Sequence, residues 1–114
     1  MKILIVEDQP MISFLLEDVV DGMGHEVVGP ASNGDEAVAL VTKGGFDGAL
    51  VDYNLDKGST SLEAALLMVK AGIPFIFLSG LGQINEYPEL ANIRLITKPF
   101  VITDIETAIS SFQS

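Results

Sequence analysis

Five short apolar runs are spaced along the chain, and a segment with a different pattern follows each of them. Continuous apolar runs of a few residues are typical of strands that are buried on both faces of a parallel sheet. The runs predict strands over residues 3–6, 26–28, 49–51, 75–78 and 93–96. Each predicted strand ends next to a polar or glycine-containing segment.

Apolar residues at helical spacing follow four of these strands. They predict helices over residues 10–23, 32–43, 60–71 and 102–112. Residues able to cap a helix stand near three of the starts. These candidate caps are Ser32, Asn33 and Asp35, then Thr60 with Glu63, then Thr103 with Glu106. Gly80, Gly82 and Pro88 interrupt the remaining segment, residues 80–92, and permit at most a short or irregular fourth helix there.

This alternation predicts an α/β fold with a doubly wound, five-stranded parallel sheet, because right-handed crossovers place helices on both faces. The chain has 114 residues, which is the size of one ordinary domain. We therefore expect a single domain over residues 1–114. Phe112 belongs to the last predicted helix, so we expect no output domain on this chain.

Charge narrows the possible partners. Sixteen acidic residues against six Lys and Arg give a formal net charge of -10, which repels nucleic acid and anionic lipid surfaces. We therefore expect no nucleic-acid and no membrane partner. The chain has no cysteine, which agrees with a reducing compartment. Its first apolar run is too short for a signal peptide or a membrane span, and we expect a cytoplasmic protein.

Polar residues stand at the ends of four predicted strands. Glu7 and Asp8 follow the first strand, Asp52 the third, Ser79 the fourth and Lys98 the fifth. Ligands of open parallel sheets bind outside the carboxyl ends of the strands, so these groups are expected at one rim. Three crowded carboxylates repel one another unless a cation lies between them, and Mg²⁺ prefers such oxygen ligands.

The same residues predict phosphoryl transfer at this rim. An aspartate can accept a phosphoryl group as a nucleophile, and Asp52 is placed to do so. Lys98 would then stabilise the charge on the phosphoryl oxygens, and Ser79 would donate a hydrogen bond to them. The sequence therefore predicts a Mg²⁺-dependent aspartyl phosphate at Asp52.

In its order and spacing, the set formed by Glu7-Asp8, Asp52, Ser79 and Lys98-Pro99-Phe100 resembles the response-regulator receiver domain of two-component signalling. The resemblance covers the whole chain and implies the flavodoxin-like strand order 2-1-3-4-5 and a cis bond between Lys98 and Pro99. It implies that Glu7 and Asp8 bind the metal and that Asp52 is phosphorylated. It further implies a metal-ligating carbonyl at Asn54, switching by Ser79 and phosphoryl contact by Lys98.

The resemblance also implies partners and leaves some features open. A sensor histidine kinase or a histidine phosphotransferase would supply the phosphoryl group, and an unknown downstream protein would receive the signal, or phosphate would be relayed or drained. Residues 74–80 resemble short, single-domain receivers of the alphaproteobacterial type. Receivers often carry Tyr or Phe at the position of Leu95, and this ring swings inward when the Ser or Thr binds the phosphate. Because Leu95 has no such ring, we expect residues 80–92 to switch between order and disorder instead.

Two other functions remain as alternatives to a phosphorylation switch. A docking domain that never uses phosphate would have no reason to keep every member of the site. A phosphatase with an aspartate nucleophile would need a second acid two residues later, where this chain has Asn54. We therefore expect a signalling switch that catalyses only its own phosphorylation and dephosphorylation, and no other enzyme activity.

Overall fold

The computed structural model describes residues 1–55, 60–80, 88–90 and 92–113. The elements in chain order are β1 (Lys2–Val6), α1 (Pro10–Gly22), β2 (Glu26–Ala31), α2 (Gly34–Lys43), β3 (Gly48–Asp52), α3 (Leu62–Ala71), β4 (Phe75–Ser79), the 3-10 helix η2 (Pro88–Leu90), β5 (Leu95–Thr97) and α4 (Ile102–Ser111). The strands form one parallel sheet in the order β2-β1-β3-β4-β5. Both the predicted α/β class and the predicted strand order are confirmed.

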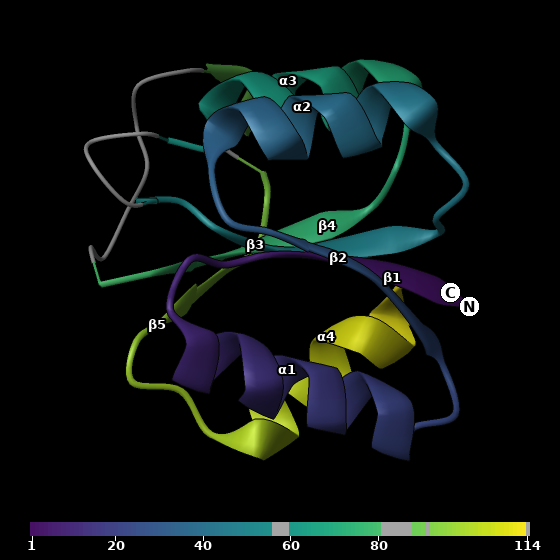
Figure 1. The fold of residues 1–114 in the computed structure, drawn as a ribbon, viewed down its shortest axis with the longest axis vertical. Coiled ribbons are helices and arrows are strands. Elements are labelled where there is room, and N and C mark those ends of the chain that lie inside the picture. The colour runs from purple at the N-terminus through teal and green to yellow at the C-terminus, as the bar shows by residue number, and fades with distance from the viewer. Residues whose placement is uncertain (56–59, 81–87, 91, 114) are drawn as a thin grey trace.

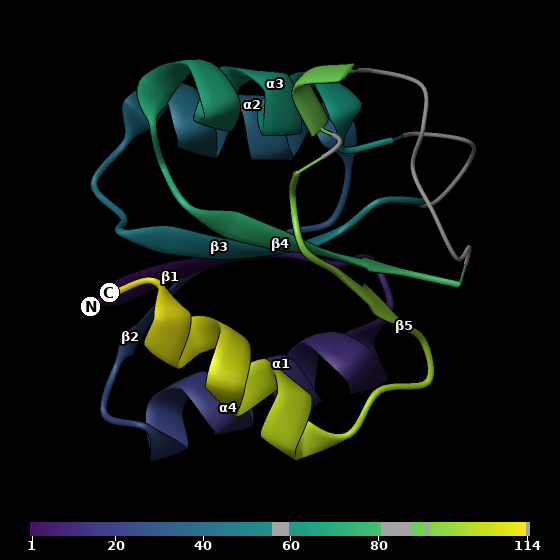
Figure 2. The same ribbon diagram turned by 180° about the vertical axis from the view of Figure 1, so that it is seen from behind.

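The sheet lies between two layers of helices (Figures 1 and 2). Helices α1 and α4 cover one face, and α2 and α3 cover the other. Alternate residues of each central strand feed two separate cores, since successive strand side chains point to opposite faces. Ile3 and Ile5 pack with α1 and α4, whereas Leu4 and Val6 pack in the core beneath α2 and α3. Burial on both faces explains why these strands read as continuous apolar runs.

Strands β1 and β3 are neighbours, and the chain leaves their carboxyl ends toward opposite faces of the sheet. β1 leads into α1 on one face, and β3 leads toward α3 on the other (Figure 1). Such a switch point opens a crevice above the two strand ends. The residues after Val6 and at the end of β3 therefore border the same crevice.

Some predicted boundaries are confirmed and others are wrong. Asn33 is the N-cap of α2, and its side chain accepts a hydrogen bond from the Glu36 N–H, as predicted. The capping box predicted at Thr60 is wrong, because the N-cap of α3 is Ser61 and its side chain makes no cap bond. The cap predicted at Thr103 is also wrong, since α4 begins at Ile102 after Val101.

The fifth strand and the fourth helical segment also differ in detail from the prediction. β5 begins two residues later than predicted, because the Ile93 N–H donates to the Leu90 carbonyl in a turn after η2. The short helix η2 agrees with the irregular fourth helix predicted from the glycines and Pro88. The order–disorder switch predicted for residues 80–92 falls mostly on residues 81–87 and 91, which lie outside the described residues.

Two further features complete the fold. The Lys98–Pro99 bond is cis, as the family resemblance implied, and the Gly29–Pro30 bond is also cis, which was not predicted.

Within the part of the chain that the structure describes, no helix has the length and apolar composition needed to span a membrane.

Candidate functional site

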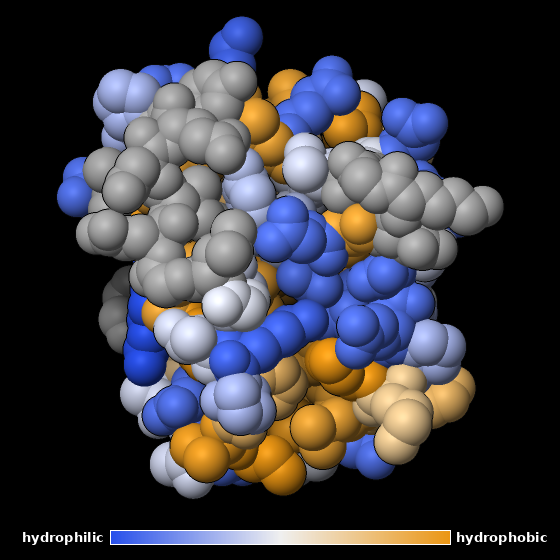
Figure 3. Space-filling model, turned by 90° about the vertical axis from the view of Figure 1, so that its left-hand side faces the viewer, coloured by the Kyte–Doolittle hydropathy of each residue, from blue (hydrophilic) through white to orange (hydrophobic). Residues whose placement is uncertain are grey.

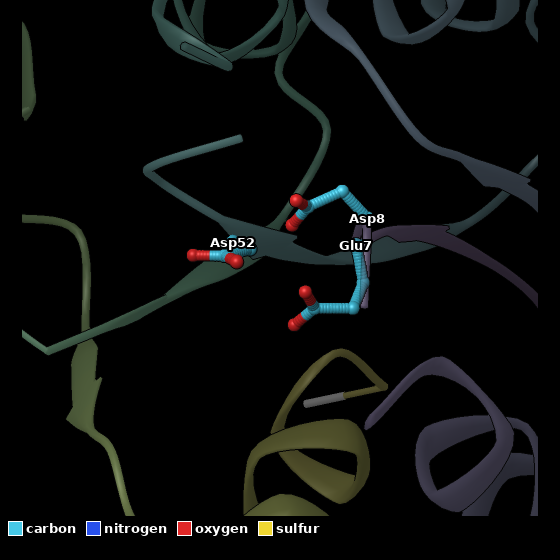
Figure 4. Close-up of side chains that lie close together, drawn as sticks. All are labelled: Glu7, Asp8 and Asp52. Carbon is cyan, nitrogen blue, oxygen red and sulfur yellow. The ribbon is translucent and has the colours of Figure 1, made fainter. Parts of the chain in front are cut away.

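Three carboxylates meet at the carboxyl ends of β1 and β3. Glu7 and Asp8 follow β1, and Asp52 is the last residue of β3, so all three project over the switch point (Figure 4). One carboxylate oxygen from each residue lies within 4.8 Å of the other two. Glu7 and Asp52 are buried and Asp8 is half-buried. The fold thus concentrates negative charge where the sequence predicted it.

Lys98 reaches this cluster from the loop after β5. Its Nζ atom lies 3.0 Å from Glu7 Oε1 and 3.0 Å from Asp52 Oδ2. The contact with Asp52 places Lys98 at the predicted position beside the proposed nucleophile. The contact with Glu7 was not predicted. A single ammonium group therefore neutralises part of the charge on two buried carboxylates.

Backbone N–H groups also hold the carboxylates in place. The Gln9 N–H donates to Glu7 Oε2 over 3.2 Å, and the Asn54 N–H donates to Asp52 Oδ1 over 3.3 Å. Such bonds orient both carboxylates, and the bond to Glu7 also favours its charged form. Sequence reasoning missed them, because any residue other than proline offers a backbone N–H and side-chain identity gives no signal.

Ser79 and Asn54 occupy the rim beside the carboxylates. Ser79 is the last residue of β4, is fully buried, and accepts the Lys98 N–H at its backbone carbonyl over 2.8 Å. This bond ties the end of β4 to the lysine. Asn54 is exposed two residues after Asp52 and is bridged to Thr60. The two residues lie near the site as predicted, and their roles stay predictions.

Burial and charge shift the pKa values of two of these groups. Burial raises the pKa of Glu7 above its ordinary value, and the negative charge of Asp52 adds to the rise, while hydrogen bonds from Gln9 and Lys98 oppose it. Burial alone would lower the pKa of Lys98. Its hydrogen bonds and ion pairs with Asp52 and Glu7 outweigh that effect and raise the pKa of Lys98. The lysine is therefore firmly cationic at neutral pH.

The donor set fits a small, hard divalent cation. Three carboxylates and one ammonium leave a formal charge of -2 at the site, which one divalent ion would balance. All three candidate ligands offer oxygen, the donor atom that Mg²⁺ prefers, and one oxygen from each lies within 4.8 Å of the other two. These residues could therefore hold such an ion together.

The protein belongs to the response-regulator receiver domain family. The model of this family matches residues 3–110, which is nearly the whole chain. The strand order agrees with the resemblance drawn from the sequence, and Glu7, Asp8, Asp52 and Lys98 lie together at one rim of the sheet. The family assignment therefore rests on the fold, the site and the sequence together.

Relatives with similar sequences include a regulator and a phosphotransferase, and a solved structure is also similar. The phyllosphere-induced regulator PhyR of Methylorubrum extorquens is 37% identical over 96% of this chain and 42% of its own length. The sporulation initiation phosphotransferase F of Bacillus subtilis is 33% identical, covering 97% of this chain and 92% of its own length. The solved structure of SdrG from Sphingomonas melonis Fr1 superposes with a TM-score of 0.83 at 31% identity, covering 99% and 96% of the two chains.

These matches refine the sequence-based assignment. The similarity to PhyR and SdrG agrees with the resemblance of residues 74–80 to the alphaproteobacterial subgroup. The chain spans less than half of the PhyR sequence that it matches but nearly all of phosphotransferase F and SdrG. Receivers of this length thus occur both alone and as parts of longer regulators.

Proposed function

We propose that this protein is a phosphoacceptor switch in which Asp52 receives a phosphoryl group in a Mg²⁺-dependent reaction. The observation that supports this most directly is the position of Lys98 Nζ, which lies 3.0 Å from both Glu7 Oε1 and Asp52 Oδ2. This placement puts one cation beside the nucleophile and leaves two negative charges for a metal to balance. Receivers are signalling switches, and no enzyme activity is proposed beyond the chain's own phosphorylation and dephosphorylation.

Each residue has a proposed role in that reaction. A carboxylate oxygen of Asp52 would attack the donor phosphorus as the bond from phosphorus to the donor breaks. The imidazole of a phosphohistidine would leave as a neutral ring after taking a proton from water, whereas acetyl phosphate would release acetate. Glu7, Asp8, Asp52 and the Asn54 carbonyl would hold the metal, which neutralises charge on the transferring oxygens. Lys98 and Ser79 would bind phosphoryl oxygens, and Ser79 would relay the modification to the surface.

Both alternatives have less support than the switch. A phosphatase with an aspartate nucleophile lacks its second acid, since Asn54 occupies that position and is exposed. A docking domain that does not use phosphate would gain nothing from burying Glu7 and Asp52, because buried charges cost free energy unless they are paired. The pairing with Lys98 offsets that cost here, and reactivity supplies a reason to keep the arrangement.

The proposed phosphodonor is a sensor histidine kinase or a histidine phosphotransferase, acting in the cytoplasm. An apolar patch beside the site supports a protein partner (Figure 3). It consists of Met11, Phe14, Leu15, Val101 and Ile102, of which Met11 is 86% and Phe14 64% exposed. Clustered exposed apolar residues mark interaction sites. A protein seated on this patch would bring its phosphoryl group close to Lys98 and Asp52.

The proposal is tested by the intact mass of the chain after incubation with acetyl phosphate, with and without Mg²⁺. We expect a gain of one phosphoryl group that needs Mg²⁺ and is lost in Asp52→Ala, Asp8→Ala and Lys98→Ala. Glu63→Ala, on the exposed surface of α3, is the matched control and should be phosphorylated normally. If Asp52→Ala still gains the group, Asp52 is not the acceptor.

A product too short-lived for mass spectrometry needs a second measurement. Beryllofluoride mimics an aspartyl phosphate without hydrolysis, and its binding is followed by NMR of the backbone amides. Shifts at Asp52, Ser79 and Lys98 in the presence of Mg²⁺ would support the switch. Absence of both phosphorylation and beryllofluoride binding would favour the phosphate-independent docking domain.

A further inference from the structure

Strand β2 carries one extra residue opposite the end of β1. Leu4 is paired with Val28, but Val6 is paired with Ala31, so two steps along β1 correspond to three steps along β2. This is a β-bulge, which leaves residues unpaired and bends the strand that contains it. The extra length falls on Gly29 and Pro30, immediately before the two strands reach the site.

The chemistry of these two residues explains the bulge. Pro30 has no N–H group, so it cannot donate to the ladder between β1 and β2. Gly29 has a φ of 92°, a conformation that residues with a side chain rarely adopt. A Cβ atom at Gly29 would also lie 2.9 Å from the Ala31 nitrogen and 3.0 Å from the Ile5 carbonyl oxygen. Glycine is therefore required by both the backbone angle and the available space.

Beyond the bulge, β2 makes contact with the proposed metal site. The Glu7 N–H donates to the Ala31 carbonyl over 2.9 Å. The Glu7 side chain is fully buried and is bonded at one oxygen to Lys98 and at the other to the Gln9 N–H. β2 thus fixes the backbone of Glu7, while Lys98 and Gln9 fix its carboxylate.

We propose that Gly29 is a positioning residue for Glu7: its bulge brings the Ala31 carbonyl to the Glu7 N–H and so sets where the Glu7 and Asp8 carboxylates stand relative to Asp52. The inference rests on the proposed function, because it treats Glu7 and Asp8 as metal ligands. A shift of the register by one residue moves the backbone groups of a strand by about 3.3 Å. Loss of the bulge would therefore move the Ala31 carbonyl out of reach of Glu7.

The test compares Gly29→Ala with Gly24→Ala. Gly24 has a φ of 83° but no atom within 4 Å of an added Cβ, so it carries the same backbone penalty without the collision. Mg²⁺ affinity is measured by calorimetry on folded protein, and thermal unfolding is measured for both variants. We expect the Mg²⁺ dissociation constant to rise about tenfold, or about 1.4 kcal/mol, in Gly29→Ala and to change less than twofold in Gly24→Ala.

A second variant keeps the test decisive if Gly29→Ala does not fold. Replacing the Glu7 N–H by an ester oxygen removes the bond to Ala31 and leaves every side chain intact. We expect weaker Mg²⁺ binding and, in the native protein, slow hydrogen exchange at the Glu7 amide. Unchanged Mg²⁺ affinity in the ester variant, or an equal loss in Gly24→Ala, would overturn the inference. If the native chain itself binds no Mg²⁺, the proposed function fails instead.

Discussion

Glu7 is held in a buried position by several partners with opposing effects. Burial and the charge of Asp52 disfavour its ionised form, whereas Gln9 and Lys98 favour it. The net result is a pKa above the ordinary value of 4.5. Since Lys98 also bonds Asp52, a substitution of the lysine removes a hydrogen bond from both carboxylates. Replacing one residue of the site therefore changes the electrostatic environment of the others.

Replacing Lys98 with methionine isolates the contribution of its charge. Methionine has a similar length and no charge, so Glu7 would lose a hydrogen bond and an ion pair without losing its burial. We expect the pKa of Glu7 to rise further in Lys98→Met, measured by carbon NMR of the carboxyl group without added metal. The matched control is Lys2→Met, because Lys2 is exposed and its Nζ atom lies 3.8 Å from the exposed Glu26 carboxylate. An unchanged Glu7 pKa would contradict the bond to Lys98.

The direction of the accompanying stability change follows from the same pKa. A buried acid whose pKa is raised by folding holds its proton more tightly in the folded state. Folding then becomes less favourable as pH rises from the unfolded pKa through the folded pKa. We expect the free energy of unfolding of Lys98→Met to fall below that of the native protein over this range. Urea unfolding on both sides of it would show the difference.

At the scale of single elements, the start of α2 is fixed by a side-chain cap, which the described starts of α1, α3 and α4 lack. Asn33 Oδ1 accepts the Glu36 N–H over 2.9 Å, and the Glu36 carboxylate accepts both the N–H and the hydroxyl of Ser32. The bonds from Ser32 lower the pKa of Glu36. The Asn33 side chain thus binds the backbone of Glu36, and the Glu36 side chain binds the backbone of Ser32. This reciprocal arrangement resembles a capping box.

Removal of this cap should cost a measurable part of the stability. We expect Asn33→Ala to lower the free energy of unfolding by about 1 kcal/mol, because a helix N–H loses its side-chain acceptor. Thr103→Ala is the control, since Thr103 was a predicted cap but lies inside α4. Urea unfolding should show almost no loss for that variant. Equal losses in both would mean that the Asn33 bond contributes nothing specific.

The sequence could predict those elements whose signals are local and strong. Apolar runs marked every strand, and the polar residues that follow them marked the site, because parallel strands deliver their ends to one rim. The misplaced cap at Thr60 shows where local rules fail: Ser61 is buried and its hydroxyl donates to the Tyr53 carbonyl, a contact from another part of the chain. Strand register is equally non-local, so the bond from Glu7 to Ala31 was not predictable. The bulge at Gly29 was missed because the predicted strand ended at Val28, whereas β2 continues to Ala31.

At the scale of the whole molecule, charge and apolar surface are distributed differently around the site. The chain carries a net charge of -10, yet in the described part of the chain five of the six exposed large apolar residues lie on or beside α1 and α4, next to the carboxylates. The sixth, Leu67, lies on α3 on the opposite face of the sheet. This contrast provides a matched pair of positions for testing whether a protein phosphodonor uses the patch.

Phe14→Ser and Leu67→Ser should therefore have different effects on phosphorylation by a protein. The donor would be any histidine kinase or phosphotransferase that phosphorylates the native chain. We expect Phe14→Ser to slow transfer from that protein about tenfold, because truncating an apolar contact at an interface commonly costs about 1 to 2 kcal/mol. Leu67→Ser should transfer at the native rate. Both variants should react normally with acetyl phosphate, which is too small to need the patch. Normal protein transfer in Phe14→Ser would exclude this face as the donor site while leaving the role of Asp52 intact.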